Sequence, residues 1–206
     1  MIRILSISGS PVPGSSTEIL LERIAASLGK ALAVKSRHVF VRLSDYDIAP
    51  CQACGEAPTP RYCFIDDAMT ELYEKVEECD CLLFGSPIYF DSVSAQAKIF
   101  IDRCNCVRPY NFDRGPTGHH FIRLLHRTRP GAIVLVGGEK GWFEGARRCI
   151  AGFFKWIEVT NEACLKFHSL EDNKIGEARE RPEALREADE IGQRLAEIIE
   201  RQHGRR

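Results

Sequence analysis

Apolar stretches alternate with helical patterns along most of the chain. Five apolar stretches predict strands, at residues 2–7, 37–43, 80–85, 131–137 and 159–167. The segments between them repeat apolar residues every three or four positions, which indicates helices at residues 17–28, 66–78, 94–103 and 142–157. The C-terminal part is a charged amphipathic helix whose apolar stripe carries Leu185, Ala188, Ile191, Leu195 and Ile198.

This alternation of strands and helices indicates a parallel sheet covered by helices on both faces. We expect one α/β domain over residues 1–206, a flavodoxin-like three-layer sandwich with a five-stranded parallel sheet in the order 2-1-3-4-5. Ligands of such sheets bind beyond the carboxyl ends of the strands, beside strand 1. The loops after strands 1, 3 and 4 are therefore expected to face one pocket.

Composition narrows the classes of partner. The chain has 206 residues, 44% of them hydrophobic, which is enough for an ordinary core. The formal net charge of −1 and the absence of a long basic stripe argue against nucleic acid as a partner. No apolar run reaches the length of a membrane span, and the N-terminus lacks a signal-peptide layout. We therefore expect a cytoplasmic protein whose nine cysteines are thiols or metal ligands.

The segment "SGSPVPGSST", residues 8–17, follows the first strand and opens a helix. Backbone N–H groups and the positive end of a helix converge at such a point and bind anions. The glycine spacing is that of a triphosphate loop, but Ser15 stands where that loop needs lysine, and no carboxylate ends strand 3 to hold magnesium. The expected ligand is a single terminal phosphate, held by the hydroxyls of Ser8, Ser10, Ser15, Ser16 and Thr17 in a turn that Pro11 shapes. A plain cluster of helix-capping hydroxyls is the alternative.

The loop after the third strand offers a surface for a planar ring. Pro87 stiffens the exit of the strand, and Ile88, Tyr89 and Phe90 add apolar and aromatic surface beside the phosphate loop. The alternative is a hydrophobic loop packed on a neighbouring helix. After the fourth strand, Gly137 and Gly138 would let the backbone approach a ligand closely. Trp142, which follows, is interpreted as the start of the buried face of its helix.

Three segments resemble the family of NADPH-dependent FMN reductases and iron–sulfur flavoproteins. They are "SGSPVPGSST", "IDDAMTELYEKVEECDCLLFGSPIYFDSVSAQAKIFIDR" and "VGGEKG". The resemblance implies a flavodoxin-like fold, tightly bound FMN and electron transfer from NAD(P)H to an acceptor. It implies that the first loop holds the FMN phosphate and that Pro87, Ile88, Tyr89, Phe90, Asp91 and Ser92 line the ring, with Gly137 and Gly138 at its edge. The flavin carries the redox chemistry, so we expect no catalytic side chain.

The run from Cys51 to Cys63 resembles the cysteine motif with which iron–sulfur flavoproteins hold a [4Fe–4S] cluster. Cys51, Cys54 and Cys63 match, but Ala57 stands at the third position. Because such a cluster uses four thiolates, we expect no stable cluster and no metal, and interpret these residues as thiols beside the flavin. Cys104 and Cys106 are expected to be too far away to substitute. Zinc held with His119 or His120 and a redox thiol pair Cys51/Cys54 are alternatives.

The predicted function is an FMN-dependent NAD(P)H oxidoreductase that passes electrons to a small acceptor, such as a flavin or quinone. The alternative is an FMN electron-transfer protein, with or without an iron–sulfur cluster. A non-redox protein that binds another phosphate ligand is a third hypothesis. Reductases that resemble this chain imply a homodimer or homotetramer. The basic stretch with Arg114, His119, His120, Arg123, Arg127 and Arg129 is either a rim for the NADPH phosphate or a solvated surface loop.

Overall fold

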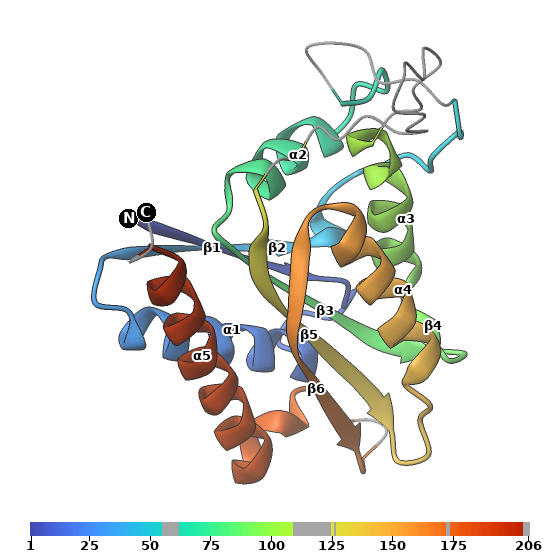
Figure 1. Cartoon of the computed structure of the whole chain (residues 1–206). Coiled ribbons are helices and arrows are strands. Elements are labelled where there is room, and N and C mark those ends of the chain that lie inside the picture. Colours follow the sequence, from blue (N-terminus) through green and yellow to red (C-terminus); the bar gives the residue numbers. More distant parts are fainter. Residues whose placement is uncertain (55–61, 109–124, 126, 172–173, 204–206) are drawn as a thin grey trace.

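A parallel sheet of five strands forms the centre of the molecule (Figure 1). The computed structural model describes residues 1–54, 62–108, 125, 127–171 and 174–203. The strands run in the order β2-β1-β3-β5-β6. Their bounds are β1 (Ile2–Ser8), β2 (Ser36–Arg42), β3 (Cys81–Tyr89), β5 (Arg129–Gly138) and β6 (Val159–Ser169). Counted among themselves, these strands have the expected order 2-1-3-4-5, so the flavodoxin-like topology is confirmed.

A sixth, short strand corrects the predicted count of five. β4 (Ser92–Val93) pairs antiparallel with the end of β3, Tyr89 opposite Ser92. β3 therefore continues four residues beyond the predicted end at residue 85, through Pro87. Phe90 and Asp91 form the turn, both with positive φ (52° and 55°). Such turns normally use Gly or Asn, so no residue in the sequence signals this hairpin.

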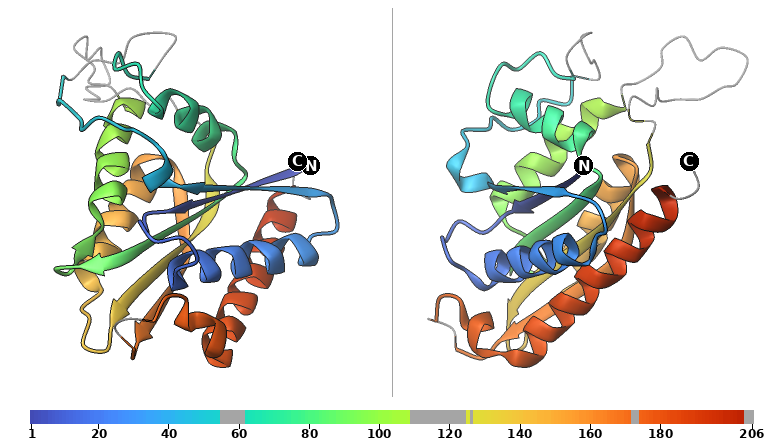
Figure 2. Two further views of the ribbon diagram at one scale, coloured as in Figure 1. Left: turned by 180° about the vertical axis from the view of Figure 1, so that it is seen from behind. Right: turned by 90° about the vertical axis from the view of Figure 1, so that its left-hand side faces the viewer.

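Helices cover both faces of the sheet, as Figure 2 shows. α1 (Ser16–Ala31) and α5 (Pro182–His203) pack side by side on one face. The other face carries α2 (Met69–Glu78), α3 (Ala95–Arg103) and α4 (Glu144–Trp156). Three short 3₁₀ turns complete the elements: η1 (Leu43–Asp45), η2 (Cys104–Val107) and η3 (Glu177–Glu180). Within the described ranges, no helix is long and apolar enough to cross a membrane.

Strand alternation explains how one sheet supplies two cores. Successive side chains of a strand point to opposite faces. In β3, Leu82 and Phe84 belong to the core under α2, α3 and α4. Cys81 and Leu83 belong to the core under α1 and α5. A near-continuous apolar run is therefore needed in a central strand, which is why residues 81–84 were recognisable as buried.

A buried ion pair ties the segment after β2 to the end of α3. Arg103 is 1% exposed and donates to both carboxylate oxygens of Asp67, at 2.5 and 3.0 Å. Arg103 also donates to Ala49 O (2.8 Å), while Ala49 N donates to Asp67 (3.0 Å). Burial alone would raise the pKa of the Asp67 carboxyl, but these hydrogen bonds outweigh it and lower the pKa below its usual range.

This network corrects the expected position of the cysteines. Cys63 Sγ lies 3.7 Å from Arg103 Nη2, at the carboxyl end of α3, whereas the predicted flavin loop leads into the amino end of that helix. Cys63 is therefore not beside the flavin loops. Cys106 Sγ contacts Arg103 O (3.1 Å), and burial together with the nearby Cys63 raises the Cys106 pKa to about 11. The expectation that Cys106 is far from the Cys51–63 run is thus wrong for Cys63.

Two arginines of the predicted basic rim are structural. Arg129 is 2% exposed and donates to Val76 O and to Ile157 O, so it joins the ends of α2 and α4. Arg127 forms an ion pair with Asp80. The other members of the predicted rim, Arg114, His119, His120 and Arg123, lie outside the described residues.

We predict that Asp67→Asn destabilises the protein by about 3 kcal/mol at pH 7, because it leaves the buried Arg103 without its counter-charge. The folded-state pKa of Asp67 is lowered, so its stabilising contribution is present above the unfolded pKa of about 4 and disappears as the pH falls through the folded value. Urea denaturation at pH 7 and near pH 3 measures both effects.

The matched control is Asp102→Asn, one residue before Arg103. Asp102 pairs with Lys98 on the exposed side of α3, and such a pair contributes less than about 1 kcal/mol. Equal destabilisation by the two substitutions would contradict the role given to Asp67.

Candidate functional site

Three loops meet at the carboxyl ends of β1, β3 and β5, as the topology predicts. Gly9 N donates to Gly85 O (2.8 Å), and Ser94 Oγ donates to Gly9 O (2.6 Å). These bonds join the first loop to the end of β3 and the start of α3. A Cβ atom placed on Gly137 would lie 3.5 Å from Ile88, so the third loop borders the second. The structure thus brings residues from all three predicted segments to one edge.

Two predicted phosphate-binding serines shape the first loop from within. Ser8 is fully buried, and its Oγ accepts a hydrogen bond from Ser10 N (3.2 Å). Ser10 Oγ accepts from Val12 N (3.2 Å). Pro11 is half-buried in this turn. These hydroxyls hold the backbone of the loop in its shape.

The first turn of α1 offers unpaired donors. Ser15 is the N-cap, and its hydroxyl accepts from Glu18 N (3.4 Å). The backbone amides of Ser15, Ser16 and Thr17 have no hydrogen-bond partner in the described part of the chain, nor does the hydroxyl of Thr17, a residue 1% exposed. These groups lie at the positive end of α1, so the turn is suited to an anion.

A buried carboxylate, that of Glu18, fixes the backbone of this loop. Glu18, 4% exposed, accepts from Gly14 N (2.8 Å) and from Arg42 Nε and Nη2 (2.5 and 3.0 Å). Hydrogen bonding to Glu18 raises the pKa of the Arg42 guanidinium above its usual range. Gly14 adopts φ 70°, a left-handed conformation that favours glycine. The end of β2 therefore fixes the backbone just before the unpaired amides.

The segment after β6 forms a further wall of the site. Ala178 N, in η3, donates to Ser16 Oγ (3.1 Å), which leaves the Ser16 hydroxyl proton available for another acceptor. Arg179 Nη1 donates to Gly14 O at 3.5 Å. Gly176 has φ 75°, and a Cβ there would lie 2.7 Å from Gly14 O. The two segments are thus in close contact although they lie some 160 positions apart.

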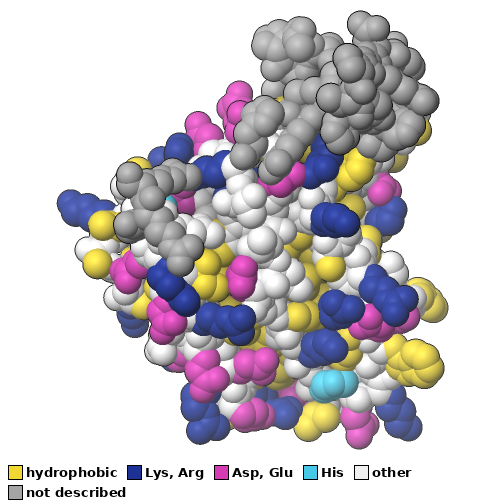
Figure 3. Space-filling model, viewed as in Figure 1, with side chains coloured by type: hydrophobic (Ala, Val, Ile, Leu, Met, Phe, Trp, Pro, Cys, Tyr) yellow, Lys and Arg dark blue, Asp and Glu magenta, His cyan; other side chains and the backbone are white. Residues whose placement is uncertain are grey.

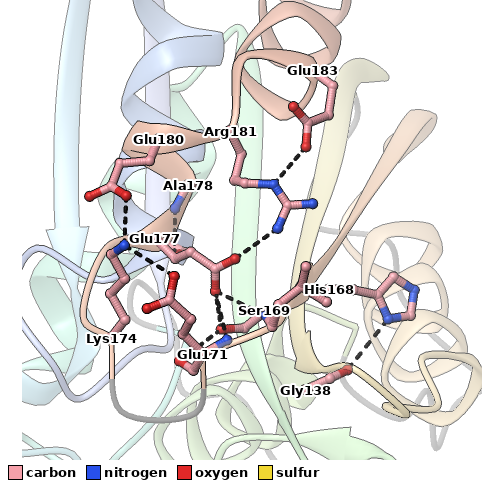
Figure 4. Close-up of polar contacts among 12 residues, drawn as sticks. Gly138, His168, Ser169, Glu171, Lys174, Glu177, Ala178, Glu180, Arg181 and Glu183 are labelled. Carbon is pink, nitrogen blue, oxygen red and sulfur yellow. Dashed lines mark hydrogen bonds and ion pairs between the residues drawn. The ribbon is translucent and has the colours of Figure 1, made fainter.

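Glu177 holds this wall in place, as Figure 4 shows. Its Oε2 accepts from Ser169 Oγ (2.6 Å) and from the amides of Leu170 and Glu171 (3.0 and 3.3 Å). Its Oε1 accepts from Arg181 (2.8 Å). Burial alone would raise the pKa of the Glu177 carboxyl, but these donors lower it below its usual range. Glu177 is therefore an anion that fixes the turn after β6.

The predicted ring-binding segment forms an exposed aromatic edge. Pro87 and Ile88 are half-buried, whereas Tyr89 is 48% and Phe90 105% exposed, and Asp91 and Ser92 are exposed. The Asp91 carboxylate accepts from Gly145 N (3.2 Å), which holds the turn against the start of α4. Hydrophobic side chains gather at the right-hand edge of the face in Figure 3, over this turn and the loop before α4.

Trp142 does not begin the buried face of its helix, contrary to the prediction. It is 77% exposed, and the next residue, Phe143, is the buried one at 7%. Phe143 packs edge-on against His168 with ring centroids 4.7 Å apart. His168 Nδ1 lies 3.4 Å from Gly138 O, and Gly137 lies against Phe143. The glycine loop after β5 is thus supported by β6.

Several residues of the site were not predicted from the sequence. They are Glu18, Arg42, Ser94, Gly176, Ala178 and Arg179. Glu18 could have been found, since Ser15 and Glu18 form the S-x-x-E pattern of a capping box. The others are brought to the loop by tertiary contacts, for which no local pattern exists.

The topology defines a flavodoxin-like protein, and the crossover after β1 is a candidate ligand site at its switch point. Residues 2–161 match the NADPH-dependent FMN reductase family, and the chain belongs to that family. It is therefore an oxidoreductase with FMN as cofactor and NAD(P)H as electron donor.

Individual relatives agree with this assignment. An iron–sulfur flavoprotein of Methanosarcina thermophila is 30% identical over 158 residues, 77% of this chain and 74% of the relative. The iron–sulfur flavoprotein MJ1083 of Methanocaldococcus jannaschii is 28% identical over 96% of this chain and 97% of its own length. The FMN-dependent NADH-azoreductase of Bacillus anthracis, solved with FMN, has the same fold (TM-score 0.62, 13% identity, 95% and 100% covered).

The relatives are named for an iron–sulfur centre, and the run from Cys51 to Cys63 does not by itself supply enough thiolates for a [4Fe–4S] cluster. A [4Fe–4S] cluster uses four thiolates, and this run supplies Cys51, Cys54 and Cys63, with Ala57 between them. Cys63 is in contact with the Arg103 guanidinium. In the described part of the chain, no three His, Cys, Asp or Glu residues are grouped so that they could hold a metal ion.

We predict that Glu18→Gln destabilises the protein by about 2 kcal/mol, because the amide cannot accept from Gly14 N and from both Arg42 nitrogens at once. Glu22→Gln, an exposed position one turn further along α1, is the control and should change stability by less than about 0.5 kcal/mol. Chemical denaturation of the two variants measures the difference. If Glu18→Gln is as stable as the control, Glu18 does not brace the loop.

Proposed function

We propose that this protein is an NAD(P)H-dependent reductase that passes electrons to a small acceptor such as a free flavin or a quinone. FMN would lie with its phosphate at the first turn of α1 and its ring against residues 87–92. The observation that carries this proposal is the set of unpaired donors on Ser15, Ser16 and Thr17 at the carboxyl edge of the sheet.

The residues present fit the phosphate end of FMN. The amides and the Thr17 hydroxyl are neutral donors at the positive end of a helix, which suits a phosphate monoester without a magnesium ion. Ser16 can donate as well, because its oxygen already accepts from Ala178 N. Ser8 and Ser10, which the sequence suggested as ligands, contribute here by fixing the loop.

The residues of the β3–β4 hairpin fit the ring end. Half-buried Pro87 and Ile88 offer apolar contact, and Gly137 and Gly138 leave the neighbouring backbone without side chains. When bound, FMN supplies a ring that takes a hydride from NAD(P)H and releases electrons to the acceptor. The protein positions the partners and excludes water, so we assign no acid or base to a side chain.

We expect the purified protein to be yellow with bound FMN and to oxidise NAD(P)H when a flavin or quinone is added. Thr17→Val removes one phosphate donor while keeping the side-chain shape, and it should weaken FMN binding about tenfold. Thr160→Val is the matched control, since Thr160 lies at the opposite edge of the sheet. Flavin absorbance, fluorescence titration and NAD(P)H oxidation at 340 nm are the measurements.

A protein that binds FMN but oxidises neither NADH nor NADPH with several acceptors would contradict the reductase proposal. It would favour the alternative, an FMN electron-transfer protein that docks other proteins. This alternative is supported by the relatives that are named iron–sulfur flavoproteins.

We further propose that this protein carries no [4Fe–4S] cluster. Protein purified without oxygen should then contain well under about one iron and one acid-labile sulfide per chain. Colorimetric iron and sulfide assays decide the question, because a full cluster would give about four of each. Cys63→Ser should leave the FMN content unchanged, since Cys63 lies at the opposite end of α3 from the flavin loops.

A further inference from the structure

The phosphate loop carries no cation of its own, yet two arginines reach it from elsewhere. Residues 9–17 contain neither Lys nor Arg. Arg42 comes from the end of β2, and Arg179 comes from η3, beyond β6. A phosphate monoester carries close to two negative charges at neutral pH, so the state of these two arginines decides the electrostatics of the site.

The positive charge of Arg42 is already balanced by carboxylates of the protein. Its guanidinium donates two hydrogen bonds to Glu18 and one to Asp45 (3.1 Å). Glu18 in turn accepts from Gly14 N, so this pair serves the loop backbone. Arg42 therefore has little capacity left for a ligand.

Arg179 differs from Arg42 in its hydrogen bonds and in its ion pairs. Its side chain is exposed, and the one hydrogen bond that this side chain makes within the described residues goes to Gly14 O at 3.5 Å, the outer limit for such a bond. It forms no ion pair with any carboxylate of the described residues. The guanidinium thus lies at the residue that precedes the three unpaired amides, with its donors and its charge largely unused.

The backbone that carries Arg179 is held firmly against the loop. Its neighbour Ala178 donates to Ser16 Oγ, and Gly176 has no room for a side chain beside Gly14 O. Glu177 fixes the turn through Ser169, Leu170, Glu171 and Arg181 (Figure 4). Arg179 is therefore presented to the loop by a braced segment, although its own side chain is exposed.

We propose that Arg179 supplies the positive charge for the FMN phosphate and makes the site prefer phosphorylated over unphosphorylated flavin. This inference rests on the proposed function, because it takes the first turn of α1 as the phosphate site. A guanidinium binds phosphate oxygens through charge-assisted hydrogen bonds that a hydroxyl or amide cannot match. Riboflavin, which lacks the phosphate, gains nothing from this charge.

The test compares FMN with riboflavin, each titrated by flavin fluorescence against wild type, Arg179→Ala and Arg179→Gln. We expect Arg179→Ala to bind FMN about tenfold more weakly and riboflavin equally well. Arg179→Gln keeps a donor for Gly14 O but loses the charge, so it should behave like Arg179→Ala. Added salt should weaken FMN binding to wild type more than to either variant.

The matched control is Arg194→Ala, which removes the same charge from an exposed position about three turns into α5. It should bind both flavins as wild type does. An unchanged ratio of FMN to riboflavin affinity in Arg179→Ala would overturn the inference. So would wild-type FMN affinity in Arg179→Gln, because Arg179 would then only support the loop through Gly14.

The outcomes separate this inference from the proposed function. If wild type binds FMN tightly and Arg179→Ala does too, the function stands and the role of Arg179 is wrong. If wild type binds neither flavin, the proposed site itself is wrong and the inference is overturned with it. Circular dichroism of each variant confirms that a lost affinity is not lost folding.

Discussion

The start of α1 has more donors than the described part of the chain satisfies, and the architecture of the site follows from this constraint. A helix leaves its first amides without partners inside the helix. Here the hydroxyl of Ser15 and the carboxylate of Glu18 satisfy the amides of Glu18 and Gly14, while the amides of Ser15, Ser16 and Thr17 have no partner among the residues that the structure describes. An unpaired buried amide is costly unless water or a ligand meets it. A ligand with several acceptors is the natural complement of this turn.

The surrounding segments hold the rest of the loop in place. Ser94 ties Gly9 to the start of α3, Glu18 and Arg42 tie Gly14 to β2, and Ala178 ties Ser16 to the segment after β6. Apart from the local bond between Gly14 and Glu18, these bonds come from parts of the chain distant in sequence. The loop therefore needs no side-chain movement to present its donors, and a ligand would meet a prepared surface. Preparation of this kind lowers the entropic cost of binding.

Local patterns predicted most of the fold and the loops of the site, and tertiary contacts account for what they missed. The apolar runs at residues 2–7 and 131–137 were recognisable because central parallel strands are buried on both faces. The β3–β4 hairpin escaped because Phe90 and Asp91 occupy left-handed positions that ordinary turn residues would have marked. The predicted position of Cys63 was wrong because the ion pair between Arg103 and Asp67 draws the segment of Cys63 to the carboxyl end of α3. That pair joins residues 36 positions apart, so no local pattern reveals it.

The balance of charge around the loop gives the site its chemical character. Two carboxylates lie near it, Glu18 and Glu177, and each is matched by an arginine, Arg42 and Arg181. Their negative charges therefore do not repel an anion, and their arginines do not attract one. At the first loop, the part of the chain that the structure describes then leaves the dipole of α1, the neutral donors of Ser16 and Thr17, and the charge of Arg179, which no carboxylate there pairs with. On the proposed role of Arg179, such a site would select a phosphate monoester, because a triphosphate would bring charge that one arginine without a metal ion cannot offset.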